Sequence, residues 1–167
     1  MSSERDTRRR RILLVDTNAR ALFALRAALS RSDIQMDFDI QHASSFEAAK
    51  SALLTDPPAV LIADVRLGSF NGLHLLMLGQ RLHPPPFGII TSDFPDAILD
   101  SEAQRIGAVY LVRPFPVAEL WAAISGGLAA SAHSNPSVPE RRLKQRRQAP
   151  ISGFNPERRV ADRRARV

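Results

Sequence analysis

Four short apolar segments constrain the fold of this chain more than any other feature of its sequence. The segments ILLVD (12–16), VLIAD (60–64), GIITS (88–92) and VYLV (109–112) are rich in β-branched residues and leucine. Turn-forming or charged residues bound them, which is typical of strands buried on both faces of a parallel sheet. A fifth segment, MDFDIQ (36–41), alternates apolar and polar residues. This alternation predicts a strand with one solvated face, at the edge of the sheet.

Helical patterns separate the predicted strands. Apolar residues recur at spacings of three, four and seven positions, which predicts five amphipathic helices. The predicted buried faces contain Leu22, Leu25 and Leu29; Phe46, Ala49 and Leu53; Leu73, Leu76 and Met77; Leu99, Ala103 and Ile106; and Leu120, Ile124 and Leu128. We expect helices to start near Asn18, Ser45 and Pro116 and to end near Gly107 and Gly126. Five strand–helix repeats with short connections predict a doubly wound parallel α/β domain over residues 11–130.

The charge of the chain is concentrated at its two ends. Of the net charge of +6, residues 1–11 contribute +3 and residues 138–167 contribute +7, which leaves the body between them at −4. We therefore expect a basic N-terminal extension (1–10) and a basic, Pro- and Arg-rich tail (131–167). The tail has few large apolar residues, so we expect it to be disordered. It is either a solvated extension or a contact for an anionic partner such as nucleic acid, lipid or an acidic protein.

Several classes of protein are disfavoured. The chain has no cysteine, which excludes a disulfide framework and a cysteine-based zinc or redox site. No segment has the length of a signal-peptide core or a membrane span, so we expect a cytoplasmic location. The four histidines have no metal-ligand spacing: they are His42, His74, His83 and His133. No nucleotide-binding glycine motif or nucleophile elbow is present, and we do not expect an enzyme.

Polar residues stand where the predicted strands end. Asp16 and Asp64 close the first and third strands, Thr91 lies near the end of the fourth, and Arg113 follows the fifth. Parallel α/β sheets bind ligands at this edge. Each residue alone has a structural explanation: a helix cap for Asp16, an ordinary strand end for Thr91, and an ion pair between Arg113 and Asp64. The four together favour a functional site.

These residues lie in motifs that resemble a known family. The segments LLVD (13–16), VLIADVRLGSFNG (60–72), GIITSD (88–93) and GAVYLVRPF (107–115) are similar to the receiver domain of bacterial two-component response regulators, the CheY-like domain. The resemblance covers about residues 11–130. It implies a flavodoxin-like sheet of five parallel strands in the order 2-1-3-4-5, with helices on both faces.

The resemblance also implies a phosphorylation site. Asp64 matches the phospho-acceptor, which takes a phosphoryl group from a phosphohistidine of a sensor histidine kinase. Asp16, Asp64 and the backbone carbonyl of Arg66 match the protein contacts to Mg²⁺. The ion lowers the repulsion between the carboxylate and the incoming phosphoryl oxygens.

A switch is implied as well. Thr91 matches the hydroxyl that follows the phosphoryl group, and Tyr110 matches the aromatic residue that reports this movement. Rotation of this aromatic residue changes the face formed by the fourth helix, the fifth strand and the fifth helix. A downstream protein partner is expected to bind there. Pro114 follows Arg113, and in the family the peptide bond before this proline is usually cis.

Three positions depart from the family pattern. Thr17 stands where the family has a second acid, which predicts weaker binding of Mg²⁺. Arg113 replaces a lysine; it is longer and planar, and either clamps Asp64 or holds phosphoryl oxygens with two N–H groups. Gly68 replaces a proline, which predicts a more flexible loop after Asp64.

The sequence thus leads to one expectation and two alternatives. We expect a stand-alone receiver that is phosphorylated on Asp64 and then changes its binding to a partner. One alternative is a phosphorylation-independent receiver that serves as a docking scaffold. The other is binding of nucleic acid through the basic tail.

Overall fold

The computed structural model describes residues 9–30 and 38–133 of the chain. Most of the predicted N-terminal extension, the first two residues of the predicted edge strand, and the predicted tail from residue 134 onward lie outside this part. Contacts divide the chain into two units, Met1–Asn135 and Pro136–Val167. Only the first unit is described below.

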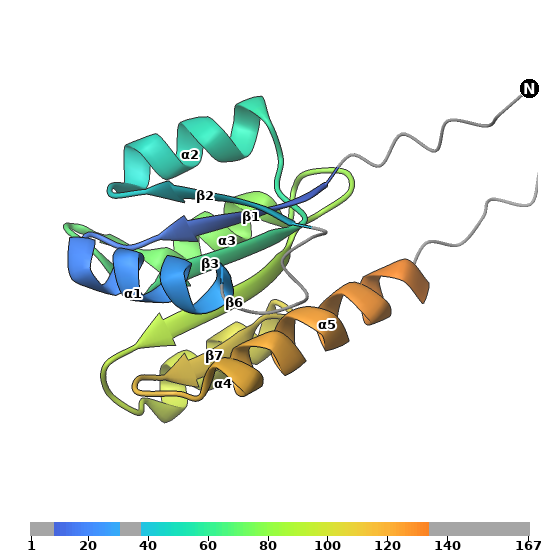
Figure 1. Cartoon of the computed structure of the whole chain (residues 1–167). Helices are drawn as coiled ribbons and strands as arrows, with labels where there is room; N and C mark the ends of the chain where they lie inside the picture. Colours follow the sequence, from blue (N-terminus) through green and yellow to red (C-terminus); the bar gives the residue numbers. More distant parts are fainter. Residues whose placement is uncertain (1–8, 31–37, 134–167) are drawn as a thin grey trace, which may run out of the picture. The chain divides into compact units, whose positions relative to one another are not determined.

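Five parallel strands form the central sheet (Figure 1), in the order β2-β1-β3-β6-β7. The strands are β1 (Arg10–Val15), β2 (Phe38–Ala43), β3 (Val60–Asp64), β6 (Phe87–Ser92) and β7 (Val109–Val112). Counted along the chain within this sheet, their order is 2-1-3-4-5, which confirms the predicted topology. The register places Ile62 beside Leu14 on one side and beside Ile89 on the other.

Helices cover both faces of the sheet (Figure 1). They are α1 (Ala19–Ser30), α2 (Phe46–Thr55), α3 (Gly72–Gly79), α4 (Ala97–Arg105) and α5 (Val117–His133). Side chains alternate between the two faces of each strand. In β1, Ile12 and Leu14 therefore pack on the side of α1 and α5, while Leu13 and Val15 pack on the side of α2, α3 and α4. No helix of the described residues is long and apolar enough to cross a membrane.

Capping side chains confirm the predicted helix starts at Asn18 and Ser45, and α5 begins directly after Pro116. The Asn18 side chain accepts the backbone N–H groups of the first turn of α1, and Ser45 Oγ accepts the N–H of Ala48 at 3.1 Å. Such caps satisfy N–H groups that have no partner inside the helix. Gly107 follows α4 with φ of 70°, a backbone conformation that glycine adopts without strain.

Two details of the predicted helices are wrong. Gly126 lies inside α5, which continues to His133. A glycine within a helix costs only about 1 kcal/mol, and the apolar face continues past it to Leu128. In α3, Met77 is about half exposed and Leu75 is buried instead. The apolar surface of α3 is wider than one stripe, so spacing alone selects the wrong residue.

A small hairpin follows β3 and was not predicted. The strands β4 (Arg66–Leu67) and β5 (Phe70–Asn71) pair antiparallel. Gly68 turns the chain between them with φ of 66°. The Phe70 ring stacks on Phe46 of α2, with ring centres 4.4 Å apart. The loop after Asp64 thus has a defined turn at the position where the resemblance expects proline.

Candidate functional site

The carboxyl edge of the sheet gathers the side chains predicted to form a site. Asp16 directly follows β1, Asp64 ends β3, and Thr91 lies beside Asp64 in the register of β3 and β6. All three are nearly inaccessible, with exposed fractions of 6%, 5% and 2%. Arg113 follows β7, and its peptide bond to Pro114 is cis, as the resemblance implies.

Arg113 joins the two buried acids. Its Nη1 donates to Asp16 Oδ2 at 2.7 Å, and its Nη2 donates to Asp64 Oδ2. The Nε of the same guanidinium donates to Asp93 Oδ1 at 3.0 Å. One planar cation is therefore held by three carboxylates, which uses the fork geometry that lysine lacks.

The remaining oxygen of each buried acid is bound by the backbone. Asp16 Oδ1 accepts the N–H of Asn18 at 2.8 Å, and Asp64 Oδ1 accepts the N–H of Arg66 at 2.7 Å. Both bonds reach two residues ahead in the chain, as in the Asx turns that aspartate forms. Every carboxylate oxygen of Asp16 and Asp64 thus has a donor, and both side chains are held in place.

Burial and pairing act in opposite directions on the ionisation of this site. Burial raises the pKa of Asp64, and the N–H of Arg66 and the charge of Arg113 only partly offset this rise. Burial lowers the pKa of Arg113, but the bond to Asp16 and the charges of Asp64 and Asp93 outweigh burial and raise it. Arg113 therefore stays protonated, while ionised Asp64 carries a cost of burial.

The donors at this edge suit a hard divalent cation such as Mg²⁺, which prefers oxygen ligands. Asp16 Oδ2 and Asp64 Oδ2 converge on one cationic group, so the position between them accepts positive charge. Thr17, next to Asp16, is exposed. Within residues 9–30 and 38–133, no three His, Cys, Asp or Glu side chains form a metal cluster. The set is thus two carboxylates, with the predicted backbone carbonyl of Arg66.

Asp93 and the side chain of Arg66 belong to the same site and were not predicted. Asp93 Oδ2 accepts the Nη2 of Arg66 at 3.1 Å, while its other oxygen accepts Arg113. The sequence contained a signal, because Asp93 follows β6 at the same edge of the sheet, one residue after Ser92. The family resemblance implies a role for Arg66 only through its backbone carbonyl.

The contacts of Arg66 lead toward the surface of α4. Its guanidinium carbon lies 5.8 Å from the ring centre of Phe94, a distance that allows a cation–π interaction. Tyr110 Oη donates to the backbone carbonyl of Phe94 at 2.7 Å. Phe94 and Ile98 are exposed to 66% and 75%. A chain of contacts thus links Arg113, through Asp93 and Arg66, to the exposed Phe94 and to Tyr110.

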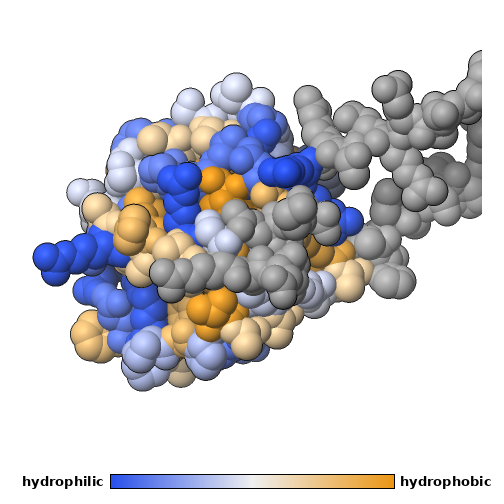
Figure 2. Space-filling model, viewed as in Figure 1, coloured by the Kyte–Doolittle hydropathy of each residue, from blue (hydrophilic) through white to orange (hydrophobic). Residues whose placement is uncertain are grey.

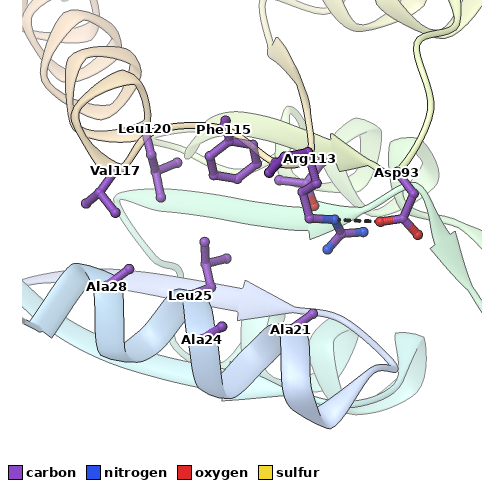
Figure 3. Close-up of a pocket in the computed structure, with 11 residues that line it drawn as sticks. Ala21, Ala24, Leu25, Ala28, Asp93, Arg113, Phe115, Val117 and Leu120 are labelled. Carbon is purple, nitrogen blue, oxygen red and sulfur yellow. Dashed lines mark hydrogen bonds and ion pairs between the residues drawn. The ribbon is translucent and has the colours of Figure 1, made fainter.

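A groove of about 400 Å³ opens next to Arg113 on the other side of the site. Alanine and leucine side chains of α1 line one wall, Phe115 and Val117 line the other, and Arg113 and Asp93 lie at one end (Figure 3). Figure 2 shows hydrophobic side chains among hydrophilic ones on the face that carries α1 and α5. The guanidinium therefore borders open space as well as the buried acids.

Comparison with known proteins identifies the fold. No protein-family model and no curated protein matches the sequence. Among solved structures, the signal receiver domain of an HD domain-containing protein from Pseudomonas fluorescens Pf-5 is 26% identical, with a TM-score of 0.66 over 75% of this chain and 99% of that one. A CheY-like response regulator receiver domain from Methanospirillum hungatei JF-1 is 18% identical, with a TM-score of 0.66 over 75% and 98%. One from Clostridium thermocellum is 21% identical, with a TM-score of 0.65 over 74% and 98%. The chain therefore has the fold of response regulator receiver domains, as its motifs predict.

Proposed function

We propose that this chain is a cytoplasmic receiver module that accepts a phosphoryl group on Asp64 from a sensor histidine kinase. The observation that carries the proposal is the position of Asp64, buried at the carboxyl edge of a receiver fold, where its Oδ2 accepts the guanidinium of Arg113 that also binds Asp16. The likeness to solved receiver domains supports the same role. In this reading the kinase is the enzyme, and the chain is its phosphoryl acceptor.

The reaction needs a nucleophile and compensation of charge. An oxygen of Asp64 forms the new O–P bond, the P–N bond of the kinase phosphohistidine breaks, and its electron pair returns to the imidazole. Because the transition state of phosphoryl transfer is loose, positioning and positive charge do most of the work. Arg113 supplies a positive charge beside Asp64 and can hold phosphoryl oxygens with two N–H groups. Asp16, Asp64 and the backbone carbonyl of Arg66 would hold Mg²⁺, which would supply positive charge beside the transferred group.

The contacts around Arg113 suggest how the signal leaves the site. New phosphoryl oxygens on Asp64 compete with Asp93 for the guanidinium of Arg113. A loosened Asp93 changes its ion pair with Arg66, whose guanidinium faces Phe94. Tyr110 bonds to the carbonyl of that phenylalanine. The α4-β7-α5 face, with Thr91 and Tyr110 as switch residues, would then change its affinity for a downstream partner.

The mass of the intact protein tests the phosphorylation. We expect the chain, incubated with Mg²⁺ and a small phosphodonor, to gain the mass of one phosphoryl group. The Asp64→Asn variant keeps the shape of the side chain and should gain none, whereas Glu119→Gln, an exposed position on α5, should react like the parent chain. A chain that gains no mass, or a gain that survives Asp64→Asn, would refute the proposal.

A second function is favoured by the same ion pairs. Because Arg113 already holds Asp64 and Asp16, the fold is also suited to a docking module that works without phosphorylation. In that case a partner would bind the parent chain and Asp64→Asn with equal affinity, both with and without phosphodonor. Unequal affinities would support the phosphorylated receiver instead.

A further inference from the structure

The position between Asp16 and Asp64 already holds a cation in this fold. The Oδ1 of each acid accepts a backbone N–H, and its Oδ2 accepts an N–H of the Arg113 guanidinium. A divalent cation that binds both acids directly must therefore displace the N–H groups of Arg113 from their Oδ2 atoms. The two cations are too close to share the position, because charges repel strongly where burial limits screening by water and salt.

The sequence makes the competition uneven. Thr17 offers no charge where another acid would strengthen the attraction for a divalent ion. Arg113 is tethered, so it is always available to the two carboxylates, whereas a free cation is present only at its solution concentration. Its planar fork also reaches both acids at once. These features favour the arginine over the free ion.

A displaced Arg113 side chain has both a remaining partner and open space next to it. Its Nε keeps a third partner, Asp93, which is half-exposed, and its side chain borders the groove between α1 and α5 (Figure 3). Release from the two buried acids therefore needs a rotation of the side chain and leaves β7 and its neighbours in place.

We propose that Arg113 and a divalent cation are alternative occupants of the position between Asp16 and Asp64, and that Arg113 sets how weakly the cation binds. The inference rests on the proposed receiver site but not on phosphoryl transfer. Cation binding then exchanges one positive group for another and releases Arg113 from the two buried acids. The released guanidinium is free to follow Asp93, which connects cation binding to the contacts of Arg66.

Binding of Mn²⁺ without any phosphodonor tests this exchange. Mn²⁺ takes the same oxygen ligands as Mg²⁺, and the loss of its free electron-paramagnetic-resonance signal reports binding. We expect Arg113→Lys, which cannot bridge both acids with a fork, to bind Mn²⁺ about tenfold or more tightly than the parent chain. Arg113→Gln removes the charge and the fork together, and it should also bind Mn²⁺ more tightly than the parent chain. Adding Asp16→Asn to Arg113→Lys should remove the gain, which would assign it to this site.

Controls separate this effect from general charge and from misfolding. Arg105→Gln removes one positive charge from the exposed surface of α4 and should leave the affinity for Mn²⁺ unchanged. Circular dichroism checks that each variant is folded, and either Arg113 variant alone suffices if the other fails to fold. Equal affinities of the parent chain and the folded Arg113 variants, or no Mn²⁺ binding by any of them, would overturn the inference. A chain that binds Mn²⁺ as expected but gains no phosphoryl mass would instead count only against the proposed function.

Discussion

Asp64 is a buried side chain whose proposed function and whose contribution to stability conflict. The proposed reaction needs its ionised form, and burial makes that form costly. Asp64 is almost fully buried, and burial raises its pKa more than the neighbouring N–H and cation lower it. An acid whose pKa is higher in the folded state binds its proton more tightly there. Its contribution to the free energy of unfolding is thus complete below the unfolded-state pKa, about 4, and declines as the pH rises toward the raised value.

This sign gives a prediction for the pH dependence of stability. We expect the parent chain to lose stability relative to Asp64→Asn as the pH rises from about 3 through the ordinary pKa of aspartate, about 4, toward neutrality. Urea unfolding of both proteins at several pH values measures the difference. The Glu119→Gln variant controls for the loss of one negative charge at an exposed position. A difference that moves in favour of the parent chain with rising pH would contradict the assignment.

The sequence predicts single residues of the site where they stand at strand ends. Asp16, Asp64, Thr91 and Arg113 could be placed together because parallel strands bring their carboxyl ends to one edge. Asp93 was missed, since its role depends on the direction in which the Arg113 side chain leaves β7. No spacing in the chain encodes that direction.

The start of α3 packs closely against the backbone of the site. Gly72, the first residue of α3, lies against the backbone of Asp64, and a Cβ atom at this position would collide with the Asp64 carbonyl oxygen. The N–H of Gly72 donates to the carbonyl of Val65 at 2.9 Å. The glycine therefore permits the chain to fold back immediately after the residue proposed to be phosphorylated.

Substitution of this glycine should cost stability. We expect Gly72→Ala to lower the free energy of unfolding by about 1–3 kcal/mol, because the backbone of β3 or the start of α3 must shift to admit the methyl group. Denaturant unfolding measures the change. Gly126→Ala is the matched control, because a Cβ atom at that position in α5 meets nothing within 4 Å. It should be neutral or stabilising, since alanine favours a helix. Equal effects of the two substitutions would show that the close packing at Gly72 is unimportant.

Helices and strands can be predicted from the sequence where nearby residues determine them. The strands have buried apolar runs, and the starts of α1 and α2 have capping side chains, so both could be located from the sequence. The β4–β5 hairpin was missed because each of its strands has only two residues, too few for a periodic pattern. The length of α5 depends on packing: Gly127 lets the helix approach the ring of Phe87 closely, which periodicity does not encode.

At the scale of the whole molecule, the sheet separates two packed layers and collects the polar residues at one edge. One hydrophobic cluster lies with α1 and α5, and the other lies with α2, α3 and α4. The strand–helix alternation predicts a doubly wound parallel sheet, and the order of its strands is what the family resemblance implies. The basic tail, with a net charge of +7 over residues 138–167, lies outside the described residues, so its disorder and its anionic partner stay predictions.

The central claim is that Asp64, among the acids around Arg113, receives the phosphoryl group. Borohydride reduces an aspartyl phosphate to homoserine, and peptide mass mapping locates the changed residue. After incubation with Mg²⁺ and a small phosphodonor, we predict homoserine at position 64 and unchanged aspartate at Asp16 and Asp93. Homoserine at either of those positions, or at none of the three, would contradict the claim.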